Sequence, residues 1–244
     1  MNLTLKKSVA RHVLPHVQGP AQYLGGELNS VRKDHSTVRG SICLAFPDAY
    51  TLGMSHHGFQ VLYSLMNDLG WACERVFTPV PDFEKAMRAA NLPLYGLETF
   101  TPLNQFDIIG FSLQYEVSYT NILTMLDLGG IALHSDDRGP DDTLVIAGGP
   151  GAQNPELIAP FVDLFIVGDG EPSLPVVAEM WASMKGDPTL SRDEKLARIA
   201  SVNEWAYVPR FYTPIYGEDG TIIEIRRLRD DVPEAIKACV VDRL

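Results

Sequence analysis

Short apolar runs alternate with segments of helical periodicity along the middle of the chain. Five runs are predicted to form strands, at residues 41–46, 75–77, 107–112, 143–147 and 162–167. Each run is apolar at consecutive positions, which is typical of strands covered on both faces of a parallel sheet. Between the runs, apolar residues recur three or four positions apart, as in amphipathic helices. The pattern therefore predicts an α/β fold built on a doubly wound, five-stranded parallel sheet.

The ends of several predicted helices carry capping signals. Asp82 is expected to cap the helix that follows the second strand, and Asn154 to cap a short helix with Pro155 at its first position. Ser191 and Glu194 have the spacing of a capping box, which predicts the start of a further helix.

Three parts of the chain differ in pattern. Residues 1–40 contain several prolines and glycines, and we expect an irregular N-terminal arm that packs on the domain. Residues 41–185 hold the alternating pattern and are predicted to form the sheet domain. Residues 186–244 are predicted to form a helix and a β-hairpin, with strands at 207–215 and 221–226 around the turn 218–220. We interpret this last part as a linker towards another domain.

Composition narrows the function classes. The formal net charge of −11 makes nucleic-acid binding by this chain unfavourable, because phosphate backbones are repelled by an acidic surface. Cys43, Cys73 and Cys239 have no metal-ligand spacing and are expected to be reduced thiols. No run approaches the roughly 18 apolar residues of a membrane span, and no secretory signal follows Met1. We therefore expect a cytoplasmic protein with no membrane contact.

Ligands of open parallel sheets bind beyond the carboxyl ends of the strands, and four loops there are unusual. They are rich in glycine, which permits close backbone approach, and in hydroxyl and amide groups. The candidate cofactor-binding residues are Asp48, Tyr50, Gly53, Met54, Ser55, Ser112, Leu113, Gln114, Tyr115, Gly148, Gly149, Pro150, Gly168, Gly170 and Glu171.

Each candidate also has a plain structural interpretation. The glycines can serve as turn residues, Asp48 and Glu171 as caps, and the tyrosines as packing residues. The chain contains no phosphate-binding G-x-x-x-x-G-K-[ST] loop, no complete G-x-G-x-x-G fingerprint and no nucleophile–His–acid order. We therefore predict no catalytic and no metal-ligating residue in this chain.

Seven segments together resemble the N-terminal half of the B12-binding radical SAM proteins of unknown substrate. They are YLGGE at 23–27, FPDAYTLGMS at 46–55, FDIIGFSLQYE at 106–116, YTN at 119–121, AGGP at 147–150, NPE at 154–156 and GDGE at 168–171. The resemblance implies a cobalamin-binding-type fold of the Rossmann or flavodoxin-like kind, with cobalamin as its cofactor. It also implies a partner barrel, in cis or in trans, in which C-x-x-x-C-x-x-C holds a [4Fe–4S] cluster and SAM.

This chain lacks C-x-x-x-C-x-x-C, so the radical chemistry cannot be assigned to any of its residues. On the resemblance, either the chain is a piece of a longer protein or the catalytic half lies on another chain. Methyl or methylthio transfer by the intact enzyme is an analogy from the family alone.

The resemblance also bears on cobalt ligation. Domains that ligate cobalt from below use D-x-H-x-x-G after the first strand, and here Tyr50 stands at the histidine position between Asp48 and Gly53. A neutral phenol is a poor cobalt ligand, so the resemblance implies cobalamin with its own base displaced and no histidine beneath the metal. His56 or His57, a few residues further on, could in principle substitute as the ligand. Two family segments accommodate the nucleotide tail, G-G and S-x-L. Gly148-Gly149 matches the first, whereas the second is only half matched, because Gln114 stands at the leucine position after Ser112.

Two alternatives remain open from the sequence. The domain could have lost its cofactor and act as a scaffold that docks the barrel or the substrate. It could also bind a flavin or a nucleotide, as flavodoxin-like sheets do, although no hydroxyl-rich phosphate loop follows the first strand.

Overall fold

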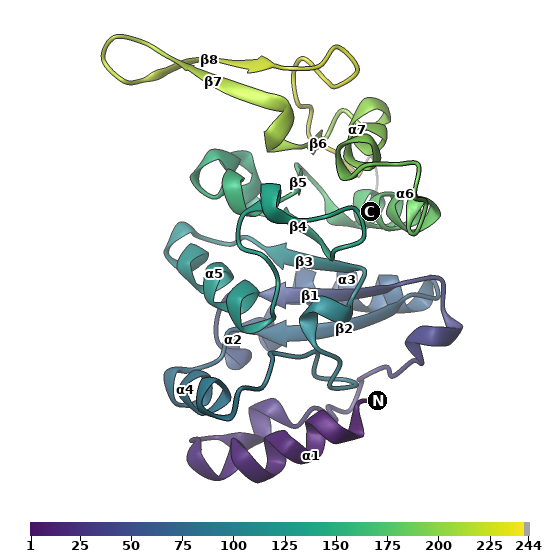
Figure 1. Ribbon diagram of the computed structural model, residues 1–244, viewed down its shortest axis with the longest axis vertical. Coiled ribbons are helices and arrows are strands. Elements are labelled where there is room, and N and C mark those ends of the chain that lie inside the picture. The colour runs from purple at the N-terminus through teal and green to yellow at the C-terminus, as the bar shows by residue number, and fades with distance from the viewer. Residues whose placement is uncertain (242–244) are drawn as a thin grey trace.

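A computed structural model describes residues 1–241 and shows a six-stranded, mostly parallel sheet (Figure 1). The strands are β1 (Ser41–Phe46), β2 (Ala72–Phe77), β3 (Ile108–Ser112), β4 (Leu144–Gly148), β5 (Leu164–Ile166) and β6 (Ala206–Tyr207). Their spatial order is β2-β1-β3-β4-β5-β6, and only β6 runs antiparallel to its neighbour. The predicted α/β fold is confirmed, but the predicted number of five strands was wrong, because the sheet also contains β6. Tyr207, assigned to the hairpin from the sequence, instead pairs with Phe165 in the main sheet.

Among residues 1–241, seven α-helices pack around the sheet. They are α1 (Leu3–His12), α2 (Tyr50–Ser55), α3 (His57–Asp68), α4 (Pro81–Ala90), α5 (Tyr119–Leu128), α6 (Gly170–Met184) and α7 (Arg192–Val202). The chain crosses from β2 past β1 to β3, so the order of strands reverses between β1 and β3. Right-handed crossovers then put α3 and α5 on opposite faces, and Figure 1 shows α3 behind the sheet and α5 in front. This reversal opens a crevice at the carboxyl edge.

The helix caps agree with the sequence in one case and differ in two. The capping box of α7 is present, with Ser191 and Glu194 bonding each other's backbone. Helix α4 begins at Pro81, two residues earlier than a cap at Asp82 implies, so Asp82 lies in its first turn and accepts a hydrogen bond from the backbone N–H of Gln18. Asn154 makes no side-chain cap, and residues 155–157 form a single 3₁₀ turn.

The N-terminal arm is less irregular than expected. Residues 3–12 form α1, whose first turn is capped by the Asn2 side chain. The prolines and glycines that suggested irregularity begin only at Pro15, so nothing inside 3–12 interrupts a helix. Leu5 and Val9 are buried in the main hydrophobic core, which attaches the arm to the sheet domain.

A separate two-stranded antiparallel hairpin follows the sheet. Its strands are β7 (Tyr212–Tyr216) and β8 (Ile222–Arg227), and it projects beyond the sheet (Figure 1). Strand β8 is close to the predicted 221–226, whereas β7 begins at Tyr212 and not at Tyr207. Among residues 1–241, no helix combines the length and the apolar character that a membrane crossing requires.

Candidate functional site

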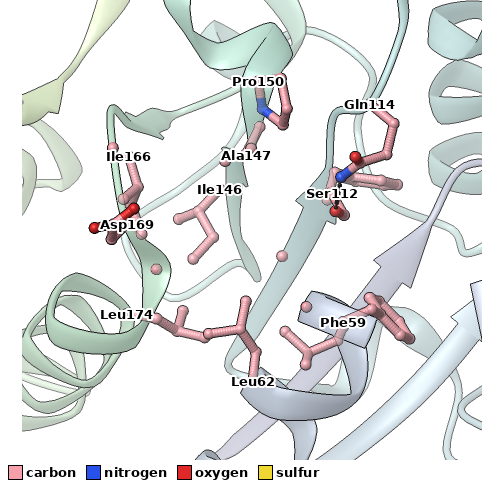
Figure 2. Close-up of a pocket in the computed structure, with 18 of the residues that line it drawn as sticks. Phe59, Leu62, Ser112, Gln114, Ile146, Ala147, Pro150, Ile166, Asp169 and Leu174 are labelled. Carbon is pink, nitrogen blue, oxygen red and sulfur yellow. Dashed lines mark hydrogen bonds between the residues drawn. The ribbon is translucent and has the colours of Figure 1, made fainter. Parts of the chain in front are cut away.

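A cavity of about 450 Å³ opens at the carboxyl edge of the sheet, between β1, β3, β4 and β5 and the helices α3 and α6 (Figure 2). Its size lies in the range of small-molecule sites. Its lining is Leu44, His56, Gly58, Phe59, Leu62, Gly110, Phe111, Ser112, Gln114, Ile146, Ala147, Gly148, Gly149, Pro150, Gln153, Ile166, Gly168, Asp169, Gly170 and Leu174. The strand residues Leu44, Ile146 and Ile166 form an apolar floor, and the polar groups Ser112, Gln114 and Asp169 lie around it (Figure 2).

The structure brings together seven of the fifteen predicted residues in this lining: Ser112, Gln114, Gly148, Gly149, Pro150, Gly168 and Gly170. The other eight are not part of it: Asp48, Tyr50, Gly53, Met54, Ser55, Leu113, Tyr115 and Glu171. The loops after β3, β4 and β5 thus converge on one site, whereas the segment after β1 reaches the cavity only at the start of α3.

Glycines create much of the space in the cavity. Gly110 lies inside β3, and a Cβ atom there would meet Ile146 and Leu44 at 3.5 Å, which is ordinary contact within the cavity wall. Gly149 has φ of +98°, and its Cβ would lie 2.9 Å from the carbonyl oxygen of Leu113, so only glycine fits without strain. The backbone is therefore exposed to a ligand at several points.

Polar side chains at the rim are partly engaged with one another. The Gln114 amide donates to the Ser112 hydroxyl at 2.7 Å, the dashed contact of Figure 2. Asp169 accepts the backbone N–H of Val241 at 2.8 Å. The His56 Nδ1 accepts the N–H of Phe59 at 3.2 Å and thereby caps α3.

This last contact fixes the tautomer of His56. Because Nδ1 acts as an acceptor, the proton of the neutral ring lies on Nε2, so Nε2 is a hydrogen-bond donor in this arrangement.

The residues of the D-x-Y-x-x-G segment hold their own loop in place. Asp48 accepts the N–H of Ala49 at 2.6 Å and the hydroxyl of Tyr115. The Tyr50 hydroxyl donates to Glu27 at 3.2 Å, and its ring packs edge-on against Phe77. Burial, followed by the negative charge of Glu27, raises the pKa of Tyr50, so the phenol stays neutral. A Cβ at Gly53 would lie 2.3 Å from the Phe77 ring, so this glycine permits close packing.

Sequence reasoning missed the apolar floor of the cavity. Leu44, Ile146 and Ile166 lie within strands and Phe59, Leu62 and Leu174 within helices, so their pattern is that of ordinary core residues. One signal was present: Gly110 interrupts an otherwise bulky apolar strand, and a glycine there often marks a close approach by another group.

Outside the cavity, the described residues hold no cluster of metal-ligating side chains, and the two core cysteines are inert. Among residues 1–241, no group of three or more His, Cys, Asp or Glu side chains is placed to hold a metal ion. Cys43 and Cys73 are fully enclosed, and burial raises the pKa of both thiols, as expected for inert structural cysteines.

Comparison with known proteins adds a family. The family described as "Radical SAM proteins, N-terminal" matches residues 58–209, which is more than half of the chain. No curated protein matches. A solved structure with 13% identity and a TM-score of 0.40 is that of the radical S-adenosylmethionine methyltransferase TsrM from Kitasatospora setae, with cobalamin and a [4Fe–4S] cluster bound. The match covers 60% of this chain and 27% of that one, so the chain spans about a quarter of that protein.

Proposed function

The chain belongs to the family of N-terminal regions of radical SAM proteins, and on that premise we propose that its cavity binds cobalamin through the nucleotide tail. The observation that carries the proposal is the glycine-lined cavity at the switch point of the sheet. It lies where the sequence resemblance expects the tail, beside Ser112 and Gly148-Gly149.

The residues present fit such a group. An aromatic base can lie on Leu44, Ile146 and Ile166 in the space that Gly110 leaves free. The exposed backbone around Gly149 and the hydroxyl of Ser112 offer polar contacts to a sugar–phosphate segment. Bound cobalamin would supply a carrier for a methyl group, and this chain would contribute binding and orientation.

We further propose that no histidine of this chain ligates the cobalt and that the base of the cofactor is displaced. Two contacts support this. Tyr50, at the position of the usual histidine, is neutral and bonded to Glu27. His56, which does reach the cavity, uses Nδ1 to cap α3 and carries its proton on Nε2.

The partner in this proposal is a radical SAM barrel with its own [4Fe–4S] cluster and SAM, in cis or in trans. In this scheme residues 41–185 form the cofactor domain, residues 1–40 brace it, and residues 186–244 lead towards the barrel.

A second candidate is a scaffold that has kept the fold and lost the cofactor. The position of Gln114 favours this candidate. Gln114 stands where the family has leucine, and its amide donates a hydrogen bond to Ser112. The same amide would lie only 3.4 Å from a Cβ at Gly149, so it narrows the space for a nucleotide tail.

A spectrum decides between the two. The chain is incubated with hydroxocobalamin and desalted, and its UV–visible absorbance is recorded. Retained cobalamin without the shifts of histidine ligation is the expected result, whereas a folded, colourless protein would leave the scaffold as the function.

A substitution inside the cavity tests the site itself. Gly110→Val fills the floor without a backbone clash, so retained cobalamin should fall at least ~tenfold, a loss of roughly 1.4 kcal/mol in binding. Urea unfolding checks that the variant keeps its fold, because a Cβ at this position lies 3.5 Å from Ile146 and Leu44. Gly139→Val is the matched control, since Gly139 lies outside the lining and a Cβ there meets only Asp142, at 3.5 Å. Equal uptake by Gly110→Val and wild type would place the cofactor elsewhere.

A further inference from the structure

The hairpin β7–β8 has one open edge. The N–H of Leu228 donates to the carbonyl of Phe211 at 2.7 Å, so the backbone of residue 228 faces β7. In an antiparallel pair this orientation alternates, so Arg226 and Glu224 also face β7, across from Thr213 and Ile215. The backbone groups of Ile225 and Arg227 therefore point outwards.

The two edges of the hairpin are not equivalent. On β7 the same alternation directs Pro214 outwards, and proline has no N–H to offer, so that edge is blocked. On β8 the outward positions retain both N–H and C=O. Within residues 1–241 the N–H and C=O groups of Ile225 and Arg227 make no backbone hydrogen bond outside the hairpin. The outer edge of β8 is therefore a template for another strand.

Apolar side chains on β8 and at the residue after it are also unusually exposed for their type. Ile223 is 68% exposed, Ile225 44% and Leu228 60%. A two-stranded hairpin is marginally stable in water, and apolar side chains in contact with solvent do not help it. Figure 1 shows the hairpin projecting beyond the sheet, so a second strand can reach this edge without meeting the sheet domain.

We propose that a second copy of this chain pairs with the edge, β8 against β8, across a two-fold axis at Ile225. Charge complementarity selects this occupant and this register. With the axis at Ile225, Glu224 of each copy lies opposite Arg226 of the other. Glu224 and Arg226 already form a bidentate pair within one chain, at 2.9 and 3.1 Å, so their side chains share a face. The dimer would join two such pairs into a square of alternating charges.

The neighbouring registers are unfavourable for the same reason. An axis at Glu224 would place that carboxylate opposite its own copy, and an axis at Arg226 would do the same with two guanidinium groups. Like charges directly opposite each other destabilise a strand pair. With the axis at Ile225, the Ile225 residues of the two copies lie directly opposite each other and exchange both backbone hydrogen bonds. This matches the outward-facing N–H and C=O of Ile225.

The test is sedimentation velocity on the full chain over a concentration series. The expected result is a concentration-dependent dimer. Ile225→Pro should raise the dissociation constant of the dimer at least ~tenfold, because it removes one outward N–H from each copy and no hydrogen bond within the hairpin. Circular dichroism checks that the variant is folded. A wild-type chain that stays monomeric throughout, or a dimer that Ile225→Pro leaves unchanged, overturns the proposal.

A charge exchange provides an independent arm. Glu224→Arg alone should weaken the dimer by placing arginines opposite arginines. Adding Arg226→Glu reverses both charges and should restore dimerisation, with the pair within the chain kept in reversed form. Failure of the double variant to recover would rule out this register.

Discussion

At the scale of single residues, Glu98 is the buried acid with the clearest energetic consequence. It is fully buried, accepts the Arg75 backbone N–H at 2.8 Å and pairs with the Arg75 side chain at 2.8 Å. Burial outweighs these favourable contacts and raises the pKa of Glu98 to about 7. The acid therefore keeps its proton in the folded state over a pH range in which the unfolded chain has already released it.

This shift predicts a pH dependence of stability. The carboxyl has a pKa of 4.5 in the unfolded chain and about 7 in the folded one, so the folded state binds more protons between these values. The free energy of unfolding should therefore fall as pH rises from 4.5 to about 7. Urea unfolding at several pH values measures it, with Glu98→Gln as the variant that lacks this fall. Glu204→Gln, at an exposed ion pair with Lys237, is the control. Parallel pH profiles for wild type and Glu98→Gln would contradict the assignment.

The candidate site was predictable residue by residue only where glycine and polar groups come directly after a strand. Gly148, Gly149 and Gly168 are found this way, because glycines at the carboxyl end of a parallel strand leave room for a ligand at the backbone. Leu44 and Phe59 were not, since a side chain that lines a cavity has the same pattern as one that fills a core. Tyr50 was predicted as a site residue because of its spacing from Asp48 and Gly53. Spacing cannot show that the Tyr50 hydroxyl donates a hydrogen bond to Glu27.

At the scale of elements, the long apolar strands and the helices between them were predicted, whereas β6 and α1 were not. The strands β1, β3 and β4 are continuous apolar runs between turns, and they lie within a residue or so of their expected bounds. Strand β6 has two residues, too few for any period to show, and its pairing with β5 is a tertiary contact. Helix α1 buries only Leu5 and Val9, a stripe too narrow to stand out beside the prolines after it.

The capping box of α7 gives an element-scale prediction. The Ser191 hydroxyl accepts the Glu194 N–H at 3.2 Å, while the Glu194 carboxylate accepts the Ser191 N–H at 2.7 Å. Ser191→Ala should lower the free energy of unfolding by about 1 kcal/mol, because the N–H of Glu194 loses its partner. Ser201→Ala, in the last turn of the same helix, should change it far less. Chemical denaturation of the three proteins measures both effects, and equal losses would show that the cap contributes nothing specific.

At the scale of the whole molecule, one buried carboxylate joins four parts of the chain. Asp163, just before β5, accepts the N–H of Val145 in β4 at 2.8 Å and pairs with Arg138 at 2.9 Å and Arg192 of α7 at 2.8 Å. Arg210, just before the hairpin, lies 3.7 Å away. Burial lowers the pKa of Arg138 although Asp163 opposes the shift, so the guanidinium depends on this partner. The cluster fixes α7 and the base of the hairpin to the sheet.

Neutralising that carboxylate should therefore weaken the fold as a whole. Asp163→Asn keeps the shape but leaves Arg138 and Arg192 buried without their counter-charge, and the free energy of unfolding should fall by about 3–5 kcal/mol. Asp127→Asn, in an ion pair with Arg88 at 2.6 Å that is exposed on both sides, should cost under ~1 kcal/mol. Urea unfolding at low and high salt separates the two, because screening reaches the exposed pair and hardly the buried one. If Asp163→Asn cost no more than Asp127→Asn, the attachment of α7 and the hairpin to the sheet would not depend on the Asp163 charge.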